Sequence, residues 1–492
     1  MLRLNKIIDE YLNNKPDKNS FWFKNSWLTR KDLLKLADEK TEILKNAGFS
    51  NGQRLVSLMP NSPDTLALML AVWRLGGIFC PLNEKTGEIS LLKTLNLLQP
   101  FAVIVSKIVK SDLIEALKNS GWPCVTSPIE NFKGITKNQD SENFAVIFST
   151  SGTTGEPKAV PLTHENLYNN CMACKEHIEI LDENDIFLNV LPNFHAFGFT
   201  IGGLLPFCIG ASEVLLESFM PPSNTIKAIE DSKANLLLLV PTMIGFVTSM
   251  LERSNKKFSG IKLLIAGGDR YNFKIDERVK NSFGVPVLEG YGITECSPVL
   301  AVNKNYNVRK LGTVGTKLPG FEIKLCSENG DEIKNSNEGI LWVKGPSVTP
   351  GYYHAEEINK ERFKDGWFYT GDYVQIDDEG YIKILDRVTD IIIVGGFNVY
   401  PQEVEAILSE HPAVNIPVVV GMPNDISGEV PKAYIVKNKD AEITSNELIK
   451  FCKERLAHYK VPRSIEFVDS LPISATGKIL RRVLRQKERE KN

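Results

Sequence analysis

The chain has 492 residues, a formal net charge of −2, 42% hydrophobic residues and 24% charged residues. This composition is typical of a globular protein of two or three domains, and the near-zero net charge argues against nucleic acid as a partner. The first ten residues carry charges where a signal peptide needs an apolar run, and no apolar run of about 18 residues follows. We therefore expect a cytoplasmic protein with no integral membrane segment, while peripheral membrane contact stays open.

From residue 30 the sequence alternates between helical and strand patterns. Apolar residues recur at helical spacing over 33–47, residues 55–59 form a short apolar run, and Pro63 opens a helix that ends near Gly76. Alternation of this kind predicts parallel sheets that are covered by helices on both faces. Further buried strands are predicted at 102–105, 186–190, 236–240, 263–266 and 285–288.

After about residue 312 the pattern changes to short alternating strands separated by turns such as Asn329-Gly330-Asp331. This change predicts a smaller β-rich unit. Helices are expected at 401–409 and 445–457. The highly charged end of the chain, 481–492, is typical of a solvated or frayed terminus.

The eight cysteines are scattered along the chain without the dense spacing of a disulfide framework, so we expect them to be reduced. Cys171 and Cys174 form a C-x-x-C pair, but no second pair or histidine partner lies at zinc spacing. We expect both thiols to be packed in the core or on a helix face.

Residues 148–160 bring hydroxyls, glycines and one lysine together in a segment suited to holding phosphates. The glycines let backbone N–H groups approach an anion, the hydroxyls add donors, and the lysine adds a positive charge. The spacing differs from that of the G-x-x-x-x-G-K-[ST] loop, and this composition is also typical of a solvated turn. A strand at 144–148 and a helix cap at 163–166 favour the phosphate-binding interpretation. The predicted ATP-binding residues are Ser149, Thr150, Ser151, Gly152, Thr153, Thr154, Gly155 and Lys158.

Five further motifs follow in order. They are Tyr291-Gly292-Ile293-Thr294-Glu295, Tyr369-Thr370-Gly371-Asp372, Asp386-Arg387, Gly395-Gly396-Phe397-Asn398-Val399-Tyr400-Pro401, and Pro472-Ile473-Ser474-Ala475-Thr476-Gly477-Lys478. Together with 148–160, this series resembles the adenylate-forming superfamily: acyl- and aryl-CoA synthetases, the adenylation domains of peptide synthetases, and beetle luciferases. The resemblance covers essentially the whole chain. It implies an enzyme that activates a carboxylate as an acyl-AMP, with ATP and Mg²⁺, and then passes the acyl group to a thiol or another acceptor.

The resemblance also implies the architecture. The expected fold class is α/β, with a large N-terminal domain of two doubly wound, mostly parallel sheets plus a small β-rich subdomain, and a small mobile C-terminal α+β domain. The implied boundaries are 1–385 for the first domain, 386–389 for a hinge and 390–492 for the second. Many relatives carry Asp or Lys two residues after Arg387, whereas this chain has Thr389, so the hinge residue stays open.

The same resemblance implies which residues would bind Mg²⁺ and the adenine base. Glu295, beside Thr294, would bind Mg²⁺, because a hard cation prefers carboxylate and phosphate oxygens. Tyr291 would form the adenine platform, with Gly290 and Gly292 letting the backbone approach the base. Taken alone, a glutamate in a glycine-rich turn is usually just exposed.

Asp372 is similar to the aspartate that accepts hydrogen bonds from the ribose hydroxyls, and Arg387 to the arginine that assists at ribose and phosphate. Lys478 matches the lysine that bridges the carboxylate and the α-phosphate during adenylation. Its distance from the other motifs implies that a mobile domain must deliver it. Gly395 and Gly396 resemble the segment that lines the thiol channel, although an ordinary left-handed turn is the alternative.

The predictions of the acyl substrate and of the acceptor come from segments outside the motifs. Residues 191–199 form an aromatic, mostly apolar segment that suits a hydrophobic acid, and His195 with Gly267 and Gly268 would line its pocket. We expect a fatty acid as the substrate and CoA as the acceptor. An aryl acid or an amino acid is the alternative to the fatty acid, and acyl carrier protein is the alternative to CoA. Asp269-Arg270 is either a selectivity feature or a surface pair. A basic surface for a carrier protein would be formed by Arg481, Arg482, Arg485, Lys487 and Arg489. The alternative outside the enzymes is a protein that binds acyl chains or nucleotide without catalysing a reaction.

Overall fold

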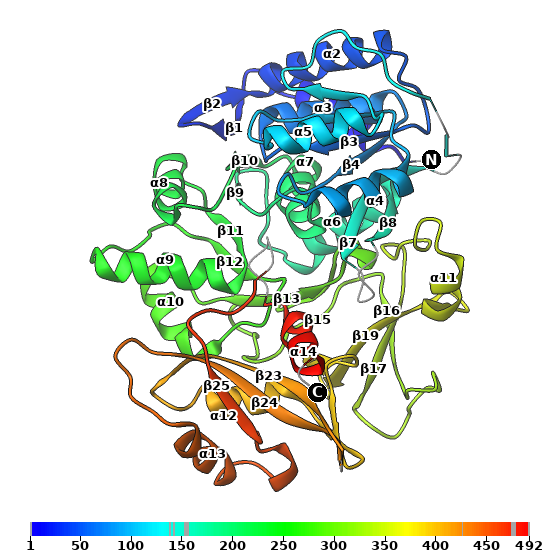
Figure 1. Cartoon of the computed structure of the whole chain (residues 1–492). Helices are drawn as coiled ribbons and strands as arrows, with labels where there is room; N and C mark the ends of the chain where they lie inside the picture. Colours follow the sequence, from blue (N-terminus) through cyan, green and yellow to red (C-terminus); the bar gives the residue numbers. More distant parts are fainter. Residues whose placement is uncertain are drawn as a thin grey trace. The chain divides into compact units, whose positions relative to one another are not determined.

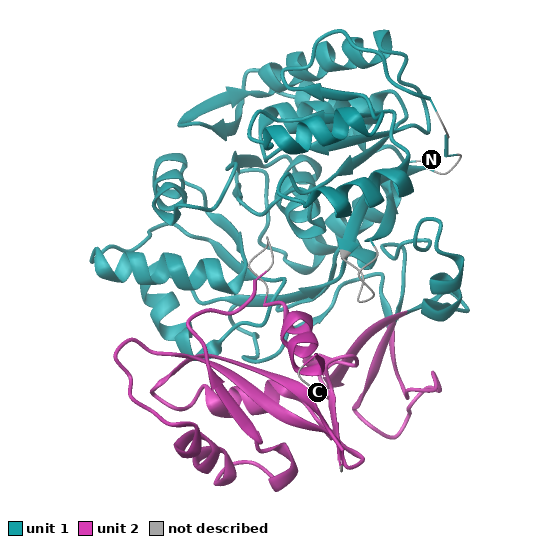
Figure 2. Cartoon of the chain, viewed as in Figure 1, with its two compact units in different colours: residues 1–322, 343–368 teal, residues 323–342, 369–492 magenta. Residues whose placement is uncertain are grey.

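The computed structural model describes residues 2–136, 139–140, 143–151, 157–425, 427–473 and 479–490. The chain divides into two compact units, Met1–Glu322 with Val343–Phe368, and Ile323–Trp342 with Tyr369–Asn492 (Figure 2). The expected boundary at 386–389 therefore falls inside the second unit rather than between the two. A pivot is a property of motion, so the expectation that the chain turns at 386–389 stays a prediction.

The first unit contains a six-stranded sheet in the order β6-β5-β3-β4-β7-β8 (Figure 1). Its strands are β3 (Arg54–Leu58), β4 (Ile78–Pro81), β5 (Ala102–Val105), β6 (Cys124–Thr126), β7 (Phe144–Ser151) and β8 (Pro157–Thr163). The first four pair in parallel, and β7 with β8 closes the sheet as an antiparallel hairpin. Helices α4 (Glu88–Leu98) and α5 (Ser111–Asn119) pack on it through apolar side chains, and the mostly buried helix α3 (Pro63–Arg74) contacts β4.

A nine-stranded sheet in the order β15-β14-β13-β12-β11-β9-β10-β1-β2 completes the core of the first unit. Its strands are β1 (Asn19–Phe23), β2 (Ser26–Thr29), β9 (Ile186–Asn189), β10 (Ser212–Leu215), β11 (Leu236–Leu239), β12 (Leu263–Ala266), β13 (Leu288–Gly292), β14 (Val299–Val302) and β15 (Thr316–Lys317). The central strands are parallel and apolar, which confirms the expected α/β class.

Helices complete the layers around this sheet. They are α1 (Leu4–Asn13), α2 (Arg30–Asn46), α6 (His164–His177), α7 (Leu205–Ile209), α8 (Pro222–Ser232), α9 (Pro241–Arg253) and α10 (Asp276–Phe283), with a π-helix η1 (Phe197–Leu204) and short 3₁₀ turns η2 (Phe273–Ile275) and η3 (Thr294–Cys296). The predicted helix cap is confirmed, because the Thr163 side chain accepts from the Asn166 N–H at the start of α6.

One strand boundary was predicted wrongly. The strand expected at 285–288 begins at Leu288 and runs to Gly292. Gly290 and Tyr291 pair with Val302 and Ala301 of β14, so the glycine-rich motif forms part of a β-ladder instead of a turn. The sequence pattern hides this because the stabilising partner is another strand.

The β-rich sheet expected after residue 312 is present, in the order β16-β17-β19-β18 with β20 beside β19. Its strands are β16 (Glu322–Cys326), β17 (Glu338–Lys344), β18 (Phe363–Lys364), β19 (Trp367–Ile376) and β20 (Ile382–Arg387), and α11 (Glu356–Arg362) precedes β18. Along the chain, β16, β17 and β19 each continue across the division between the units.

The remainder of the second unit is built on a mostly antiparallel sheet in the order β22-β21-β24-β23, with β25 parallel to β24. The strands are β21 (Ile392–Val394), β22 (Phe397–Val399), β23 (Val414–Asn424), β24 (Gly428–Lys437) and β25 (Ser464–Phe467). The helices are α12 (Pro401–Leu408), α13 (Ser445–Lys453), α14 (Arg481–Arg489) and the 3₁₀ turn η4 (His458–Lys460). Helix α13 ends four residues earlier than expected. The expectation that the charged end of the chain is solvated or frayed was wrong, because it forms α14 with Leu484 and Glu488 buried.

Candidate active site

Glu295 is held by the segment that follows β17. The Tyr352 hydroxyl donates to Glu295 Oε1 at 2.6 Å, and the Thr349 N–H donates to the Glu295 carbonyl at 2.7 Å. Thr349 also donates from its hydroxyl to the Pro161 carbonyl of β8 at 2.6 Å. These bonds place the predicted metal-binding carboxylate beside the end of the phosphate-loop hairpin.

Lys158 reaches the same place from β8. Its Nζ lies 5.4 Å from the centroid of the Tyr352 ring, so Tyr352 contacts both predicted site residues. Burial lowers the pKa of Lys158, the Arg362 charge lowers it further, and the charges of Glu295 and Glu361 oppose the shift. A partly desolvated cation attracts an anion such as a phosphate more strongly than a fully hydrated cation does.

The hairpin β7–β8 positions part of the predicted phosphate loop. Ser149 pairs with Ala159, and Thr150 pairs with Lys158 and donates from its hydroxyl to the Lys158 carbonyl at 3.4 Å. Gly152, Thr153, Thr154, Gly155 and the Ser151 side chain lie outside the described residues. Their phosphate-binding role stays a prediction.

The backbone around Tyr291 to Ser297 is shaped by close contacts. A Cβ atom at Gly292 would lie 2.2 Å from the Pro298 carbonyl oxygen, so only glycine fits there. Asn170 of α6 fastens the next turn: its side chain donates to the carbonyls of Cys296 and Val299 and accepts from the Val299 N–H. Sequence patterns singled out neither Asn170 nor Tyr352, because their partners lie far away along the chain.

The donor set at Glu295 fits a magnesium ion. Mg²⁺ is usually bound through one or two carboxylates together with substrate phosphates, and it keeps several waters. Among the described residues, no group of three or more His, Cys, Asp and Glu side chains is arranged to hold a metal by itself. Glu295, a single carboxylate whose charge acts on the predicted phosphate-binding Lys158, fits an ion that is shared between a protein carboxylate and substrate phosphates.

The two residues predicted at the ribose contact each other in the second unit. Asp372 of β19 lies opposite Arg387 of β20, and Arg387 Nε is 2.7 Å from Asp372 Oδ1. The Asp372 side chain is 3% exposed, while that of Arg387 is 55% exposed. Asp372 lies within strand β19 and not in a turn.

Two of the predicted acyl-site residues, His195 and Gly267, both lie next to Phe197. His195 Nδ1 accepts from the Phe197 N–H at 3.4 Å, and the His195 carbonyl accepts from Phe199 as η1 begins. A Cβ at Gly267 would lie 2.9 Å from the Phe197 ring, so the glycine lets this ring pack on the end of β12. Gly268 follows with a φ of +83°. Asp269 and Arg270 are both exposed.

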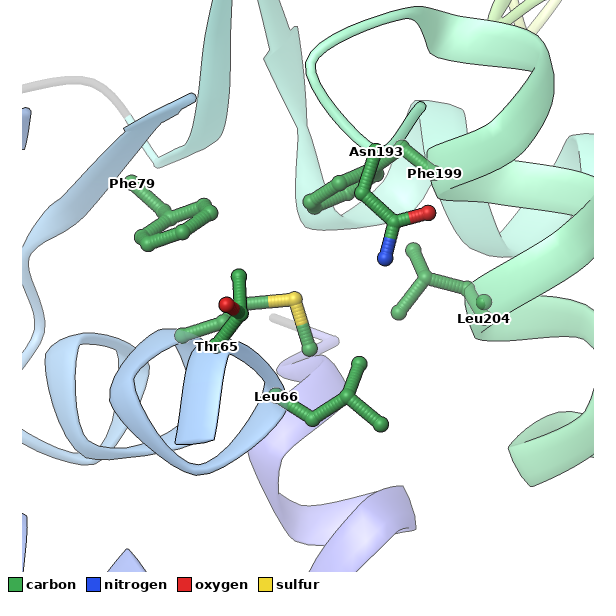
Figure 3. Close-up of a pocket in the computed structure, with 8 residues that line it drawn as sticks. Thr65, Leu66, Phe79, Asn193, Phe199 and Leu204 are labelled. Atoms are coloured by element: carbon green, nitrogen blue, oxygen red, sulfur yellow. The ribbon is translucent and has the colours of Figure 1, made fainter. Parts of the chain in front are cut away.

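A small pocket lies between α3, β4 and η1 and is lined in part by Asn193 and Phe199 of the apolar segment 191–199 (Figure 3). Its lining is mostly apolar: Thr65, Leu66, Met69, Phe79, Asn193, Phe199, Gly203 and Leu204. Asn193, two residues before His195, is 5% exposed, and its Oδ1 has no hydrogen-bond partner in the described part of the chain. The pocket therefore combines an apolar wall with one unused acceptor.

A buried polar chain supports the loop that carries His195. Asn189 of β9 donates to the Glu213 carboxyl of β10, and Asn61 donates to Asn189 Oδ1 at 3.3 Å and to the Leu191 carbonyl at 2.8 Å. Asn61 Oδ1 then accepts from the Asn193 N–H at 2.9 Å. Burial raises the pKa of Glu213 to about 8, and the Asn189 hydrogen bond only partly opposes that shift.

The titration of Glu213 should appear in protein stability. An unfolded glutamate has a pKa of about 4.3, so from there to pH 8 the folded protein keeps a proton that the unfolded chain has lost. The stabilising contribution is complete below the unfolded pKa and is lost as the pH rises through about 8. Glu213→Gln should therefore remove a downward slope of up to about 1.4 kcal/mol per pH unit in the free energy of unfolding. Urea denaturation from pH 5 to 8 checks this, and an unchanged slope would contradict it.

Gly395 and Gly396 form the turn of the hairpin between β21 and β22. Val394 pairs with Phe397 across them, and their φ angles are +56° and +87°. Two consecutive positive φ angles are typical of a type I′ turn, which strongly favours glycine. The turn alone explains both glycines, and their role in the thiol channel stays a prediction.

Lys478 lies outside the described residues, so its role also stays a prediction. The basic cluster proposed as a carrier-protein surface is described and proves to be largely paired. Arg481 binds Glu405, Arg485 binds Asp390 and Lys487 binds Glu466, each at 2.7 Å. These side chains are engaged within the unit, so the structure lends no support to an open basic docking surface.

Two further expectations concern the whole chain. The eight cysteines are all free, and Cys171 and Cys174 are buried on α6 as expected. Within the described ranges, none of the helices has the length and apolar character needed to cross a bilayer.

Comparisons with known proteins agree with the motifs. The profile of the AMP-binding enzyme family matches residues 8–353, and that of the AMP-binding enzyme C-terminal domain matches residues 403–478. A long-chain-fatty-acid–CoA ligase of Bacillus subtilis is 32% identical over 99% of this chain and 95% of its own length. A 2-succinylbenzoate–CoA ligase of Bacillus licheniformis is 34% identical over 95% of this chain and 97% of its own length.

The fold agrees as well. The o-succinylbenzoate coenzyme A synthetase of Bacillus subtilis, solved with ATP and a magnesium ion, superposes with a TM-score of 0.86 at 28% identity, covering 98% of this chain and 99% of that one. Both domain profiles match, and the similarity to a relative extends over 99% of this chain. The chain therefore belongs to the AMP-binding enzyme family.

Proposed function

We propose that this enzyme joins a fatty acid to the thiol of CoA, through an acyl-AMP made from the acid and ATP. The chain is an AMP-forming acid–thiol ligase that uses ATP, Mg²⁺ and CoA. The observation that carries the proposal is the convergence of Lys158 and Glu295 on Tyr352.

Charge neutralisation is the first requirement of the proposed reaction, because a carboxylate must approach a polyphosphate. Lys158 and the hydroxyl of Thr150 would hold the phosphates, and Asp372 with Arg387 would hold the ribose. Glu295 would hold Mg²⁺, which supplies further positive charge at the phosphates. Lys478 would stabilise the charge that develops as the carboxylate oxygen bonds to the α-phosphorus and pyrophosphate leaves. The thiol would then attack the acyl carbon and release AMP.

The fatty-acyl preference has two supports. One is the similarity to a long-chain-fatty-acid–CoA ligase over the whole chain. The other is the apolar wall of the pocket in Figure 3, whose described lining contains no acidic partner for an amino acid's α-amino group. A 2-succinylbenzoate-like aryl acid is the second candidate, because a ligase for that acid is 34% identical over most of this chain.

A substrate panel distinguishes these candidates. Pyrophosphate release and thioester formation would be measured with fatty acids of increasing length, 2-succinylbenzoate, benzoate and amino acids, with CoA and acyl carrier protein as competing acceptors. We expect the highest kcat/KM with a fatty acid and CoA. A preference for 2-succinylbenzoate, or efficient acylation of the carrier protein at the expense of CoA, would overturn the assignment.

The pocket gives a second, structural test. If the end of the acyl chain enters it, Leu204→Ala should enlarge the room and favour longer acids, whereas Leu66→Phe should favour shorter ones. Each buried methylene is worth about 0.8 kcal/mol, or about fourfold in kcat/KM. The ratio of kcat/KM for two acids that differ by two carbons is the measurement, since a general loss of stability cancels in it. Ratios that do not move in either variant would place the end of the chain elsewhere.

We also propose that the enzyme works in the cytoplasm, where eight free cysteines would stay reduced.

A further inference from the structure

Helix α14 is firmly attached to the sheet of the second unit. Leu484 packs against Val418, Val420 and Tyr434. One turn further on, Glu488 accepts from the Tyr434 hydroxyl and forms an ion pair with Lys432 at 2.9 Å. Residues 481, 484, 485 and 488 share one face of a helix, and this face is the buried one. The helix therefore cannot move independently of the sheet without breaking these contacts.

The chain just before α14 is tied down on both sides of the segment that contains Lys478. Ile473 and Ile479 form an antiparallel bridge, and the Leu480 N–H donates to the Pro472 carbonyl at 2.8 Å. Ile479 directly follows Lys478 in the sequence. The chain at Ile479 and Leu480 is thus held where α14 begins.

Arg481, at the first position of α14, forms an ion pair with an acidic side chain of α12. Its Nη2 lies 2.7 Å from Glu405 Oε2 of α12, and Glu405 is itself held by the Val419 N–H at 2.8 Å. The Arg481 charge also acts on Asp386, whose pKa burial raises to about 7. Asp386 accepts from the N–H groups of Arg387 and Gln402, so it connects the end of β20 to the start of α12.

Arg485, one helical turn later, contacts the residues immediately after β20. Its Nη2 is 2.7 Å from Asp390 Oδ1, and its Nη1 donates to the Thr389 carbonyl. Both side chains of the ion pair are mostly buried, with 22% and 16% exposed. The contact at 389 uses the backbone carbonyl, so it does not depend on the Thr389 side chain.

We propose that Arg485 is a positioning residue, which fastens residues 389 and 390, at the C-terminal end of the pivot, to α14 and so to Ile479, the residue that follows Lys478 in the sequence. This inference rests on the proposed roles of Lys478 and of 386–389. It explains why Arg485, in the last two turns of the protein's C-terminal helix, is paired with residues beside the pivot.

The consequence differs between the two half-reactions. Adenylation needs Lys478 within bonding reach of the reacting carboxylate, and small displacements of a catalytic group are costly. Thioester formation from supplied acyl-AMP does not need Lys478. Loosening Arg485 should therefore lower kcat for acyl-AMP formation about tenfold, with the KM values for ATP and acid little changed, and spare the second half-reaction.

The experiment compares Arg485→Ala, Asp390→Ala and the double variant in both half-reactions of the full-length enzyme. Arg485 and Asp390 act as a pair, so the double variant should lose no more than either single one. Arg485→Lys should recover most of the loss. The matched control is Lys487→Ala, which removes an ion pair with Glu466 from the same helix without touching 386–390. It should leave both half-reactions unchanged.

Equal loss in both half-reactions, additive losses in the double variant, or the same loss in Lys487→Ala would overturn the proposal, because each indicates general destabilisation of the helix. No loss in Arg485→Ala would also overturn it. Lys478→Ala separates this from a failure of the proposed function. If Lys478→Ala abolishes adenylation while Arg485→Ala does not affect it, only the positioning proposal fails. If Lys478→Ala leaves adenylation intact, the assignment of the lysine fails first.

Discussion

Replacing Lys478 with alanine is expected to abolish acyl-AMP formation while thioester formation from supplied acyl-AMP continues. The lysine is proposed to stabilise charge that exists only while the carboxylate is bonding to the α-phosphorus, so nothing in the second half-reaction depends on it. Loss of one such electrostatic contact typically costs about 10²–10³ in rate. ATP–pyrophosphate exchange measures the first half-reaction, and CoA thioester formation from synthetic acyl-AMP measures the second.

The control for this variant is Lys460→Ala. Lys460 forms an ion pair with Glu403 in the same unit, at 2.7 Å, and has no proposed role in catalysis. It should change neither half-reaction more than about twofold, since a partly exposed ion pair contributes only about 0–1 kcal/mol. Equal loss of both half-reactions in Lys478→Ala would show that the residue supports the unit's structure instead of the chemistry.

The second large effect is expected at Glu295. Glu295→Gln keeps the size and the hydrogen bond from Tyr352 but removes the charge that Mg²⁺ would need. We expect ATP–pyrophosphate exchange to fall by about 10²–10³, with a higher Mg²⁺ concentration required for half-maximal rate. A magnesium titration of the exchange rate is the measurement.

Tyr352→Phe is the matched control for Glu295. It removes only the hydrogen bond to Glu295 Oε1, which is worth about 1.5–3 kcal/mol at a charged acceptor, so the loss should be smaller than that of Glu295→Gln. The Mg²⁺ dependence should shift in the same direction for both. If Glu295→Gln responds to magnesium as the unaltered enzyme does, the carboxylate does not bind the metal.

The sequence predicted those parts of the fold that local patterns determine. The strands near 55, 102, 186, 236 and 263 and the cap at Thr163 could be read from apolar runs and from capping chemistry. Strand β8 and the strand character of Gly290 to Gly292 could not, because both depend on pairing with another strand. Long-range pairing overrides the turn tendency of glycine-rich sequence.

The same distinction applies to the site. Motifs mark Glu295, Lys158, Asp372 and Arg387 as candidate site residues, and the structure pairs the last two. Tyr352, which contacts both Glu295 and Lys158, carries no local signal and was missed. The charged end of the chain was misjudged for a related reason. The acidic partners of its basic side chains lie between residues 390 and 466, and only the folded unit brings them together.

The most direct test of the account follows the oxygen atoms of the substrate. If a long-chain fatty acid labelled with ¹⁸O in its carboxylate is supplied with ATP, Mg²⁺ and CoA, one labelled oxygen should appear in AMP and the other should remain in the acyl-CoA carbonyl. That result requires a bond between the carboxylate and the α-phosphorus, followed by attack of the thiol on the acyl carbon. Label in pyrophosphate or inorganic phosphate, or acyl-CoA formed with unlabelled AMP, would contradict an acyl-AMP intermediate.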